Sequence, residues 1–249
     1  MADAVVTART AIDRLLGHRV LRRQSAAVSA ESALRGARAS AALEGRPAPL
    51  ADIRGGAVAD PVVQGALRAS AQIGALTETW RQAPRQVLAR LHALAAADVV
   101  EPALLGRPRT VGQDVRSAVE LGPPPDAAEV AARLDTLVEL LTGPTAAPAL
   151  VVGAIVHGEL LALRPFGRED GIVARAAQRI CFIERGLDPK ALTAPEVGHA
   201  ELGDAYTEAL RAYETGTPTG VTTWVRHCAE AVSIAARDAL AVCEALQRG

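Results

Sequence analysis

The stretch that decides the fold is ALVVGAIVHGELLALRPFGREDGIVAR, residues 149–175. Its first part is apolar on most faces, which is typical of a helix buried at the centre of a domain. Glycine and charged residues then gather in a turn, Arg164–Gly171, before apolar residues resume at helical spacing. The pattern predicts a central helix over 148–163, a short turn and an amphipathic helix over 172–185.

Helical spacing of apolar residues continues in both directions from this stretch, and strand-like alternation is scarce. Asp60-Pro61 and Asp126 supply capping residues for two of the helices, and Gly45 followed by prolines ends another. We therefore expect an all-α, mainly helical fold. The helices expected outside the central pair cover residues 4–20, 26–43, 60–80, 84–97, 126–141, 196–213 and 221–248.

Composition limits the class of protein and its partners. The 249 residues are 49% apolar but only 2% aromatic, so alanine, valine and leucine must fill the core. With 27 basic and 28 acidic side chains, the net charge of −1 gives no electrostatic basis for binding nucleic acid or an anionic membrane. The N-terminal region lacks the apolar run of a signal peptide, and no later segment has the apolar length of a membrane span. We expect a cytoplasmic protein with neither nucleic acid nor membrane as a partner.

The cysteines and histidines show no ligand pattern in the sequence. Three cysteines cannot all pair, and reduced, buried thiols are the simplest interpretation. No metal and no cofactor are expected, because four histidines are scattered without the spacing of a metal site. These four are His18, His92, His199 and His227.

The turn at Arg164–Gly171 is the one place where local form suggests chemistry. A glycine-rich turn that leads into a helix points free backbone N–H groups and a partial positive charge at the space in front, which favours an anion. Asp170 offers a simpler interpretation, because an acidic side chain caps and stabilises a helix N-terminus. From this segment alone, capping is the favoured interpretation.

The wider stretch HGELLALRPFGREDGIVAR, residues 157–175, resembles the signature of Fic proteins, enzymes that transfer AMP from ATP to protein hydroxyls. In that family a helix carries a histidine, an aromatic and an apolar residue before His-Pro-Phe. The signature then continues with one free position, an acid, Gly-Asn-Gly-Arg, two free positions and an arginine. The matching positions here are His157, Leu160, Leu163, Pro165, Phe166, Gly171 and Arg175.

An upstream motif is similar to the same family. Family members carry Ser or Thr, three residues and then Glu-Gly at the end of a helix, and the glutamate obstructs the nucleotide site. Ser40, Glu44 and Gly45 fit this form. Between the two motifs, further family-like segments occur in the expected order at 88–94, 106–109 and 122–141.

The departures from the family pattern fall on its working residues. Arg164 stands at the position of the histidine that acts as general base, and a guanidinium cannot accept a proton at physiological pH. Arg168 replaces the acid that holds Mg²⁺. Glu169 and Asp170 stand where a glycine and an asparagine cradle the triphosphate, and Ile172 replaces the phosphate-binding arginine. Losing the base alone costs a factor of about 10² to 10⁴ in rate, so no catalytic residue is expected.

Two other residues are candidates to replace the lost groups. His157 lies two helical turns before Arg164, about 10 Å along the helix axis, and a packed histidine is the favoured interpretation. Glu169 is adjacent to the vacant acid position, but it would coordinate a metal only if Arg168 turned away.

One pairing of the family pattern is complete in this sequence. Arg175 stands where the family pairs an arginine with the inhibitory glutamate, and Glu44 is present to meet it. We therefore expect a Glu44–Arg175 ion pair. A structural role is the favoured interpretation, since two partly buried charges each need the other.

The resemblance covers about residues 26–189 and implies a Fic-like helical domain, in which a short β-hairpin flap is an option. The expected organisation is an N-terminal helix, 1–25, packed on the domain, a core over 26–190, and C-terminal helices over 191–249 that belong to the same domain. Within the core lie the inhibitory helix, 26–45, and the degenerate motif, 164–175.

The leading functional hypothesis is a degenerate Fic-fold protein, inactive as an adenylyltransferase, that acts as a regulatory or protein-interaction module. In the family a flap holds the target polypeptide by strand addition. Residues 106–122 are its counterpart, where we expect a protein partner or peptide. The alternative is a divergent enzyme, autoinhibited by Glu44, that uses ATP and Mg²⁺ to transfer AMP or another nucleotidyl or phosphoryl group to a protein hydroxyl.

Two further options stay open at this point. One is a structural or assembly role for the helical surface. The other is a variant of the leading hypothesis. In this variant the module binds an anion or nucleotide through the guanidinium groups of Arg164, Arg168 and Arg175, beside Gly171. A homodimer is compatible with the upstream motif, although the sequence has no clear exposed apolar stripe to support one.

Overall fold

Helices α7 (Ala149–Leu163) and α8 (Asp170–Glu184) form the centre of the fold, at the place that the sequence predicts. The computed structural model describes residues 1–248, none of which lies in a β-strand, so the expected all-α fold is confirmed. The other elements are α1 (Ala2–Leu16), α2 (Leu21–Leu43), α3 (Leu50–Arg54), α4 (Pro61–Gln82), α5 (Pro84–Ala95), the 3₁₀ turn η1 (Pro102–Leu104), α6 (Ala127–Thr142), α9 (Pro195–Leu202), α10 (Asp204–Glu214) and α11 (Pro218–Arg248).

The two predicted N-caps are present. Asp60 accepts hydrogen bonds from the backbone N–H groups of Val62 and Val63 at 2.9 and 3.2 Å, directly before Pro61 begins α4. Asp126 likewise accepts from two backbone N–H groups in the first turn of α6. Each carboxylate satisfies donors that the first turn of a helix leaves free, which fixes where these helices begin.

Glycines on α7 allow this helix to approach its neighbours closely. A Cβ on Gly153 would lie 2.5 Å from the Phe182 ring of α8, and one on Gly158 would lie 2.6 Å from Nε1 of Trp224 on α11. Trp224 is fully buried and donates this N–H to the carbonyl of Ala154 at 2.7 Å. The close approach places α7 between α8 and α11 and explains why most of its residues are buried.

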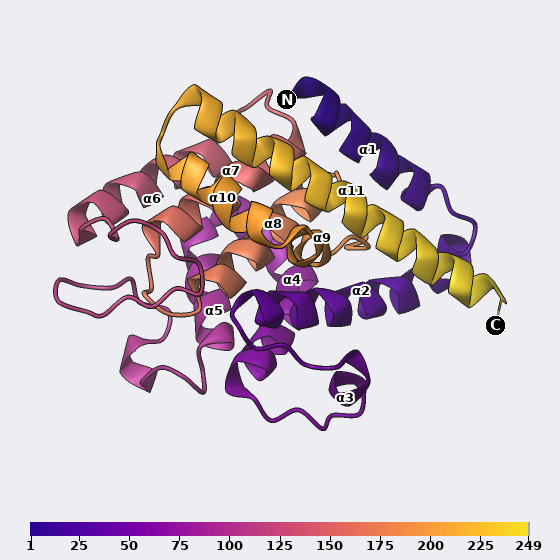
Figure 1. Cartoon of the computed structure of the whole chain (residues 1–249), viewed down its shortest axis with the longest axis horizontal. Coiled ribbons are helices and arrows are strands. Elements are labelled where there is room, and N and C mark those ends of the chain that lie inside the picture. The colour runs from indigo at the N-terminus through magenta and orange to yellow at the C-terminus, as the bar shows by residue number, and fades with distance from the viewer. Residues whose placement is uncertain (249) are drawn as a thin grey trace.

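The long C-terminal helix α11 binds the N-terminal helix to the rest of the chain. Figure 1 shows α1 lying alongside α11, and the two helices pack together along much of α1. A main core cluster includes residues from Ala8 on α1 to Ala236 on α11. A smaller apolar cluster joins Leu15, Val28 and Cys243.

Some helix boundaries differ from those predicted. The helix expected over 26–43 starts earlier, at Leu21, and is kinked at Gln24. The helix expected over 196–213 is two helices, because Gly203 adopts φ 57° and ψ −125°, a conformation that no α-helix contains.

The short β-hairpin flap, which the resemblance left as an option, is not formed within residues 106–122, all of which the structure describes. Backbone donors of this segment bond elsewhere: Arg109 N–H donates to the carbonyl of Pro165 at 2.7 Å, and Arg116 N–H to that of Gly167 at 2.9 Å. The segment, which we call the flap segment, therefore runs along the turn after α7.

The predicted state of the cysteines is confirmed, and both tryptophans lie in the core. Cys181, Cys228 and Cys243 are free and buried, and Trp80 and Trp224 are core residues. Across residues 1–248, no helix has both the length and the apolarity that crossing a bilayer requires.

Candidate functional site

The turn between α7 and α8 has an unusual backbone. Arg164 ends α7 at φ 47°, Gly167 has φ 75° and Glu169 has φ 54°. Residues other than glycine rarely adopt this left-handed region, so two strained positions flank the turn. Surrounding contacts must hold them there.

Phe166 and Asp170 supply two of these contacts. The ring of Phe166 stacks on His92 of α5, with centroids 4.3 Å apart and planes 6° apart. The Oδ1 atom of Asp170 accepts from the backbone N–H of Phe166 at 2.9 Å. Asp170 therefore ties back to the turn and makes no side-chain capping bond to α8, contrary to the capping interpretation of the sequence.

Arg164 extends into the protein. Its side chain is buried, and its guanidinium donates to the carbonyl of Gly122 at 2.8 Å and to that of Ala162 at 3.2 Å. The carboxylate of Glu214 on α10 lies 3.6 Å away. Burial lowers the pKa of Arg164 below its usual value, while Glu214 acts in the opposite direction. This side chain fastens the turn to α10 and the end of the flap segment.

Arg168 faces the flap segment. Its guanidinium lies 3.3 Å from the carboxylate of Asp114, and about a third of the side chain is exposed. Arg109 adds further support, because its side chain donates to the carbonyls of Arg164 and Leu163 at 3.0 and 3.3 Å. The turn is thus held from the flap side by charged and backbone groups together.

The predicted ion pair between Glu44 and Arg175 is present. Glu44 Oε1 lies 2.6 Å from Arg175 Nη2, and the arginine side chain is only 1% exposed. Arg175 also donates to the hydroxyl of Ser40 at 2.9 Å, to the carbonyl of Ser40 at 3.1 Å and to the hydroxyl of Tyr206 at 3.4 Å. The guanidinium therefore joins α2, α8 and α10.

The glutamate of this pair lies against the start of α8. A Cβ on Gly171 would be 1.9 Å from Glu44 Oε1, so only glycine leaves room for the carboxylate there. Gly45, at φ 76°, ends α2 directly after Glu44, and Arg46 N–H donates back to the carbonyl of Ala41 at 2.9 Å. This helix ending directs Glu44 toward α8.

Two carboxyl groups of the turn, the buried Asp170 and the half-buried Glu169, form no ion pair within residues 1–248. Burial, with a smaller contribution from the charge on Glu44, raises the pKa of Asp170 to about 8 and that of Glu169 to about 7. One oxygen of each, Asp170 Oδ2 and Glu169 Oε2, has no hydrogen-bond partner within residues 1–248. Near neutral pH a protonated Asp170 has the shape and charge of an asparagine.

Comparison with solved structures identifies the fold. A Fic family protein from Desulfovibrio desulfuricans G20 superposes with a TM-score of 0.75 at 22% sequence identity, over 96% of this chain and 74% of that one. The fold is that of Fic family proteins. Fic-1 from C. elegans is similar as well, with a TM-score of 0.70 and 18% identity over 96% of this chain and 71% of its own. No family model and no curated protein matches the sequence.

Within this Fic fold the residues singled out from the sequence separate into two groups. Ser40, Glu44, Gly171 and Arg175 meet at the start of α8. Arg164 and Arg168 do not join them, because the first bonds toward α10 and the second toward the flap segment. The cluster of three arginines considered for an anion is therefore not assembled.

His157 is a packed histidine, as expected, but the sequence did not predict which residues surround it. It is fully buried, and its Nε2 lies 2.9 Å from the hydroxyl of Tyr206. His199 and Cys228, which are distant in the sequence, lie beside it. The only sequence signal for this cluster was a histidine on the otherwise apolar surface of α7.

The Glu44→Gln substitution should lower the free energy of unfolding by about 3 kcal/mol. It leaves the buried Arg175 charge without its carboxylate, and breaking one side of a buried pair is costly. Urea unfolding measures the loss. The matched control is Asp13→Asn, which removes a carboxylate from an ion pair that is more than half exposed and should cost less than about 0.5 kcal/mol. Similar losses in both variants would contradict a stabilising role for the Glu44–Arg175 pair.

The stability of the protein should fall as the pH rises from about 6.5 to about 8. A carboxyl whose pKa is higher in the folded chain keeps a proton that the unfolded chain has already lost, so stability decreases until the folded pKa is passed. For Asp170, with its pKa raised to about 8, the loss over this window is about 1 to 2 kcal/mol. The pKa values of buried His157 and His199 are lowered, so these residues change the stability mainly at pH values below this window.

Urea unfolding at several pH values tests this dependence. Asp170→Asn keeps the acceptor oxygen for Phe166 N–H and removes the titration, so its stability should vary less over the window. Asp13→Asn, at an exposed position, should keep the wild-type slope. Equal slopes in wild type and Asp170→Asn would contradict the raised pKa.

Proposed function

We propose that this protein is a Fic-fold module that does not transfer AMP and acts by binding a protein partner. The observation that carries the proposal is the state of Arg164. This side chain stands where the resemblance places the general base, and its guanidinium is buried against two carbonyls and Glu214. A group held in this way neither accepts a proton nor faces a substrate hydroxyl.

The charges around the start of α8 support the same proposal. The carboxylate of Glu44 fills the space in front of Gly171, where the resemblance places phosphate. Arg168, at the position of the metal-binding acid, pairs with Asp114, and Ile172 offers no guanidinium. A triphosphate with Mg²⁺ would meet a carboxylate at its phosphates and a guanidinium at the position where the resemblance places the anionic ligand of its metal.

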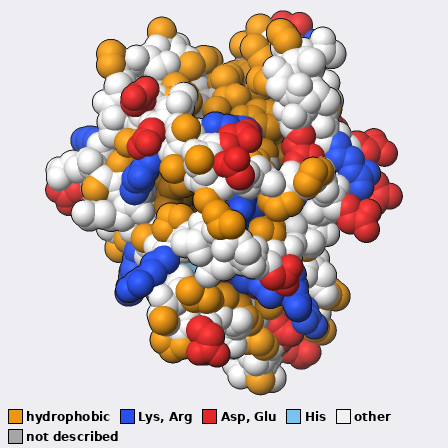
Figure 2. Space-filling model, turned by 90° about the vertical axis from the view of Figure 1, so that its left-hand side faces the viewer, with side chains coloured by type: hydrophobic (Ala, Val, Ile, Leu, Met, Phe, Trp, Pro, Cys, Tyr) orange, Lys and Arg blue, Asp and Glu red, His pale blue; other side chains and the backbone are white. Residues whose placement is uncertain are grey.

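The flap side of the turn is where we place the partner. Two cavities, of about 310 and 270 Å³, lie beside Phe166, the first bordered by α5 and the second by Arg168 and Asp114. Val111 of the flap segment is 90% exposed. Acidic and basic side chains are interspersed over the face of the molecule that Figure 2 shows, with apolar groups between them. Apolar and mixed-charge surface of this kind suits a polypeptide.

A second candidate function rests on Glu169. Its pKa is raised to about 7, and its Oε2 has no partner within residues 1–248, so it could take up a proton near neutral pH. Under this alternative the chain is a divergent nucleotidyl or phosphoryl transferase, Glu169 is the base and the Glu44–Arg175 pair is autoinhibitory. The two candidates differ in whether nucleotide is bound and transferred.

Neither wild type nor Glu44→Gly should bind or transfer nucleotide. Calorimetry with ATP, GTP and CDP-linked ligands, with and without Mg²⁺, should give no heat beyond dilution, and incubation with α-labelled ATP should label no polypeptide. The physical reason is the loss of base, metal ligand and phosphate clamp together. Labelling that increases in Glu44→Gly and disappears in Glu44→Gly with Glu169→Gln would overturn the proposal and establish the enzyme.

Partner binding should depend on the flap segment. Proteins cross-linked to the native chain in its own cells and identified by mass spectrometry should be lost when Val111→Asp introduces a charge on the apolar surface. Val6→Asp is the matched control, because Val6 is 64% exposed on α1 and lies outside the proposed surface. Capture of the same proteins by wild type and both variants would exclude the flap segment as the binding surface.

A further inference from the structure

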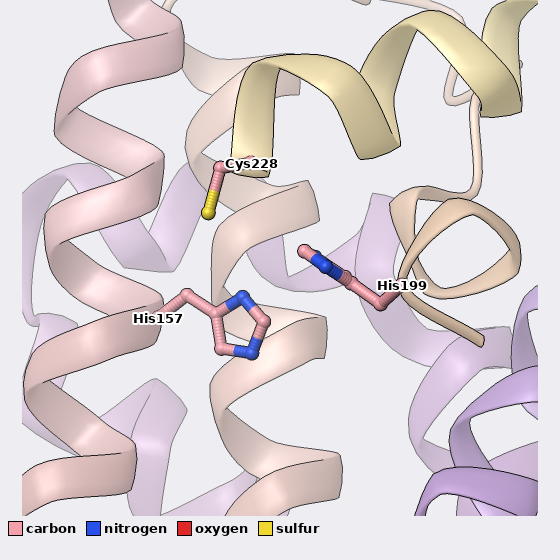
Figure 3. Close-up of side chains that lie close together, drawn as sticks. All are labelled: His157, His199 and Cys228. Carbon is pink, nitrogen blue, oxygen red and sulfur yellow. The ribbon is translucent and has the colours of Figure 1, made fainter. Parts of the chain in front are cut away.

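Three potential metal ligands meet in the core, away from the flap side of the turn. His157 comes from α7, His199 from α9 and Cys228 from α11, and all three are fully buried. One ligand atom of each lies within 4.8 Å of the others. Figure 3 shows the two imidazoles and the thiol directed into one small space between the helices.

Two nitrogens in this space have no partner. His157 Nδ1 and His199 Nε2 are buried and make no hydrogen bond within residues 1–248. A buried polar atom without a partner costs about 1 to 3 kcal/mol, so two in one place call for an explanation. A missing ligand between them is the simplest.

The opposite nitrogens of both rings are engaged. His157 Nε2 lies 2.9 Å from the Tyr206 hydroxyl, and His199 Nδ1 lies 3.0 Å from Nε2 of His227. When each of these nitrogens carries the proton and donates it, the unpartnered nitrogen of the same ring presents a lone pair to the centre. Metal-binding histidines are held in the same way, by a hydrogen bond from the second ring nitrogen.

The protonation states of the two histidines are also those that metal binding requires. Burial lowers the pKa of His157 and of His199 well below the usual value, with further lowering by neighbouring charges, so both rings are neutral at physiological pH. Neutral imidazole is the form that binds metals. Burial raises the pKa of the Cys228 thiol, so this sulfur is protonated until a cation arrives.

A fourth donor is close to the same centre. Gln178 of α8 is fully buried, and its side chain neighbours both His157 and Cys228. Neither its amide oxygen nor its amide nitrogen has a hydrogen-bond partner within residues 1–248. With this oxygen, α7, α8, α9 and α11 each contribute one donor atom.

We propose that His157 Nδ1, His199 Nε2 and Cys228 Sγ bind a structural zinc ion, with Gln178 Oε1 as the fourth ligand. Imidazole and thiolate together suit zinc and do not suit Mg²⁺ or Ca²⁺, which take oxygen ligands. Zinc–nitrogen and zinc–sulfur bonds of about 2.0 and 2.3 Å place the nitrogens of a tetrahedral site about 3.3 Å apart and each nitrogen about 3.5 Å from the sulfur. The side chains therefore close inward by about 1 Å when the ion binds.

Binding follows a simple proton balance. Zn²⁺ forms a bond to Sγ of Cys228, the S–H bond breaks, and one proton leaves to solvent while both imidazoles stay neutral. The site gains one net positive charge near Arg175, whose own charge is matched by Glu44. Under this proposal the ion joins four helices of the core, in contrast to the expectation from the sequence that the chain holds no metal. This inference is independent of the proposed function.

Metal content and cobalt spectroscopy of the full chain test the site. Reduced, chelator-treated wild type should take up one equivalent of Zn²⁺ and gain thermal stability. With Co²⁺ it should show the thiolate-to-cobalt charge-transfer band and the intense visible bands of a tetrahedral site. Cys228→Ser should lose the charge-transfer band, and His199→Gln should lose most of the metal. Cys243→Ser, which removes another buried thiol from α11, should behave as wild type does.

Three results would overturn the proposal. The first is uptake of less than about a tenth of an equivalent by wild type, which would leave a cluster of packed histidines. The second is a wild-type cobalt spectrum without a thiolate band, a result that does not depend on any variant folding. The third is an equal loss of metal from Cys228→Ser and Cys243→Ser.

Discussion

A buried positive charge organises this protein. The guanidinium of Arg175 is almost completely removed from solvent, and an ion in that position is tolerated only with close partners. Glu44 and Ser40 provide them from α2, and Tyr206 provides one from α10. The need to satisfy one charge therefore sets how three helices meet, and it requires a glycine at position 171 to leave room for the carboxylate.

The same charge connects two regions that carry polar and ionisable groups, the turn after α7 and the buried histidine cluster. On one side, the negative Glu44 that faces it raises the pKa values of Glu169 and Asp170 in the turn after α7. On the other side, Tyr206 contacts both Arg175 and His157, so the histidine cluster shares a hydrogen-bonded neighbour with the ion pair. A change at Arg175 would therefore be felt in the turn and in the core cluster together.

The turn after α7 is stabilised by side-chain and backbone contacts within the chain. The buried guanidinium of Arg164 donates hydrogen bonds to backbone carbonyls, and Arg168 pairs with Asp114. Two backbone N–H groups of the flap segment donate to carbonyls of the turn. These contacts hold two non-glycine residues in left-handed conformations. Contacts within the chain hold this strained backbone in place.

The sequence alone determined the helical class, the central helix and turn, and the capped starts at Asp60 and Asp126, because each depends on local spacing or on a short motif. The Glu44–Arg175 pair was predicted only through the resemblance to Fic proteins. Only the tertiary structure decided the directions of Arg164 and Arg168, the tie from Asp170 to Phe166, and the course of the flap segment. It also brought together His157, His199 and Cys228 from three helices. Side-chain direction and long-range proximity depend on how helices pack, and no periodicity along the chain records this.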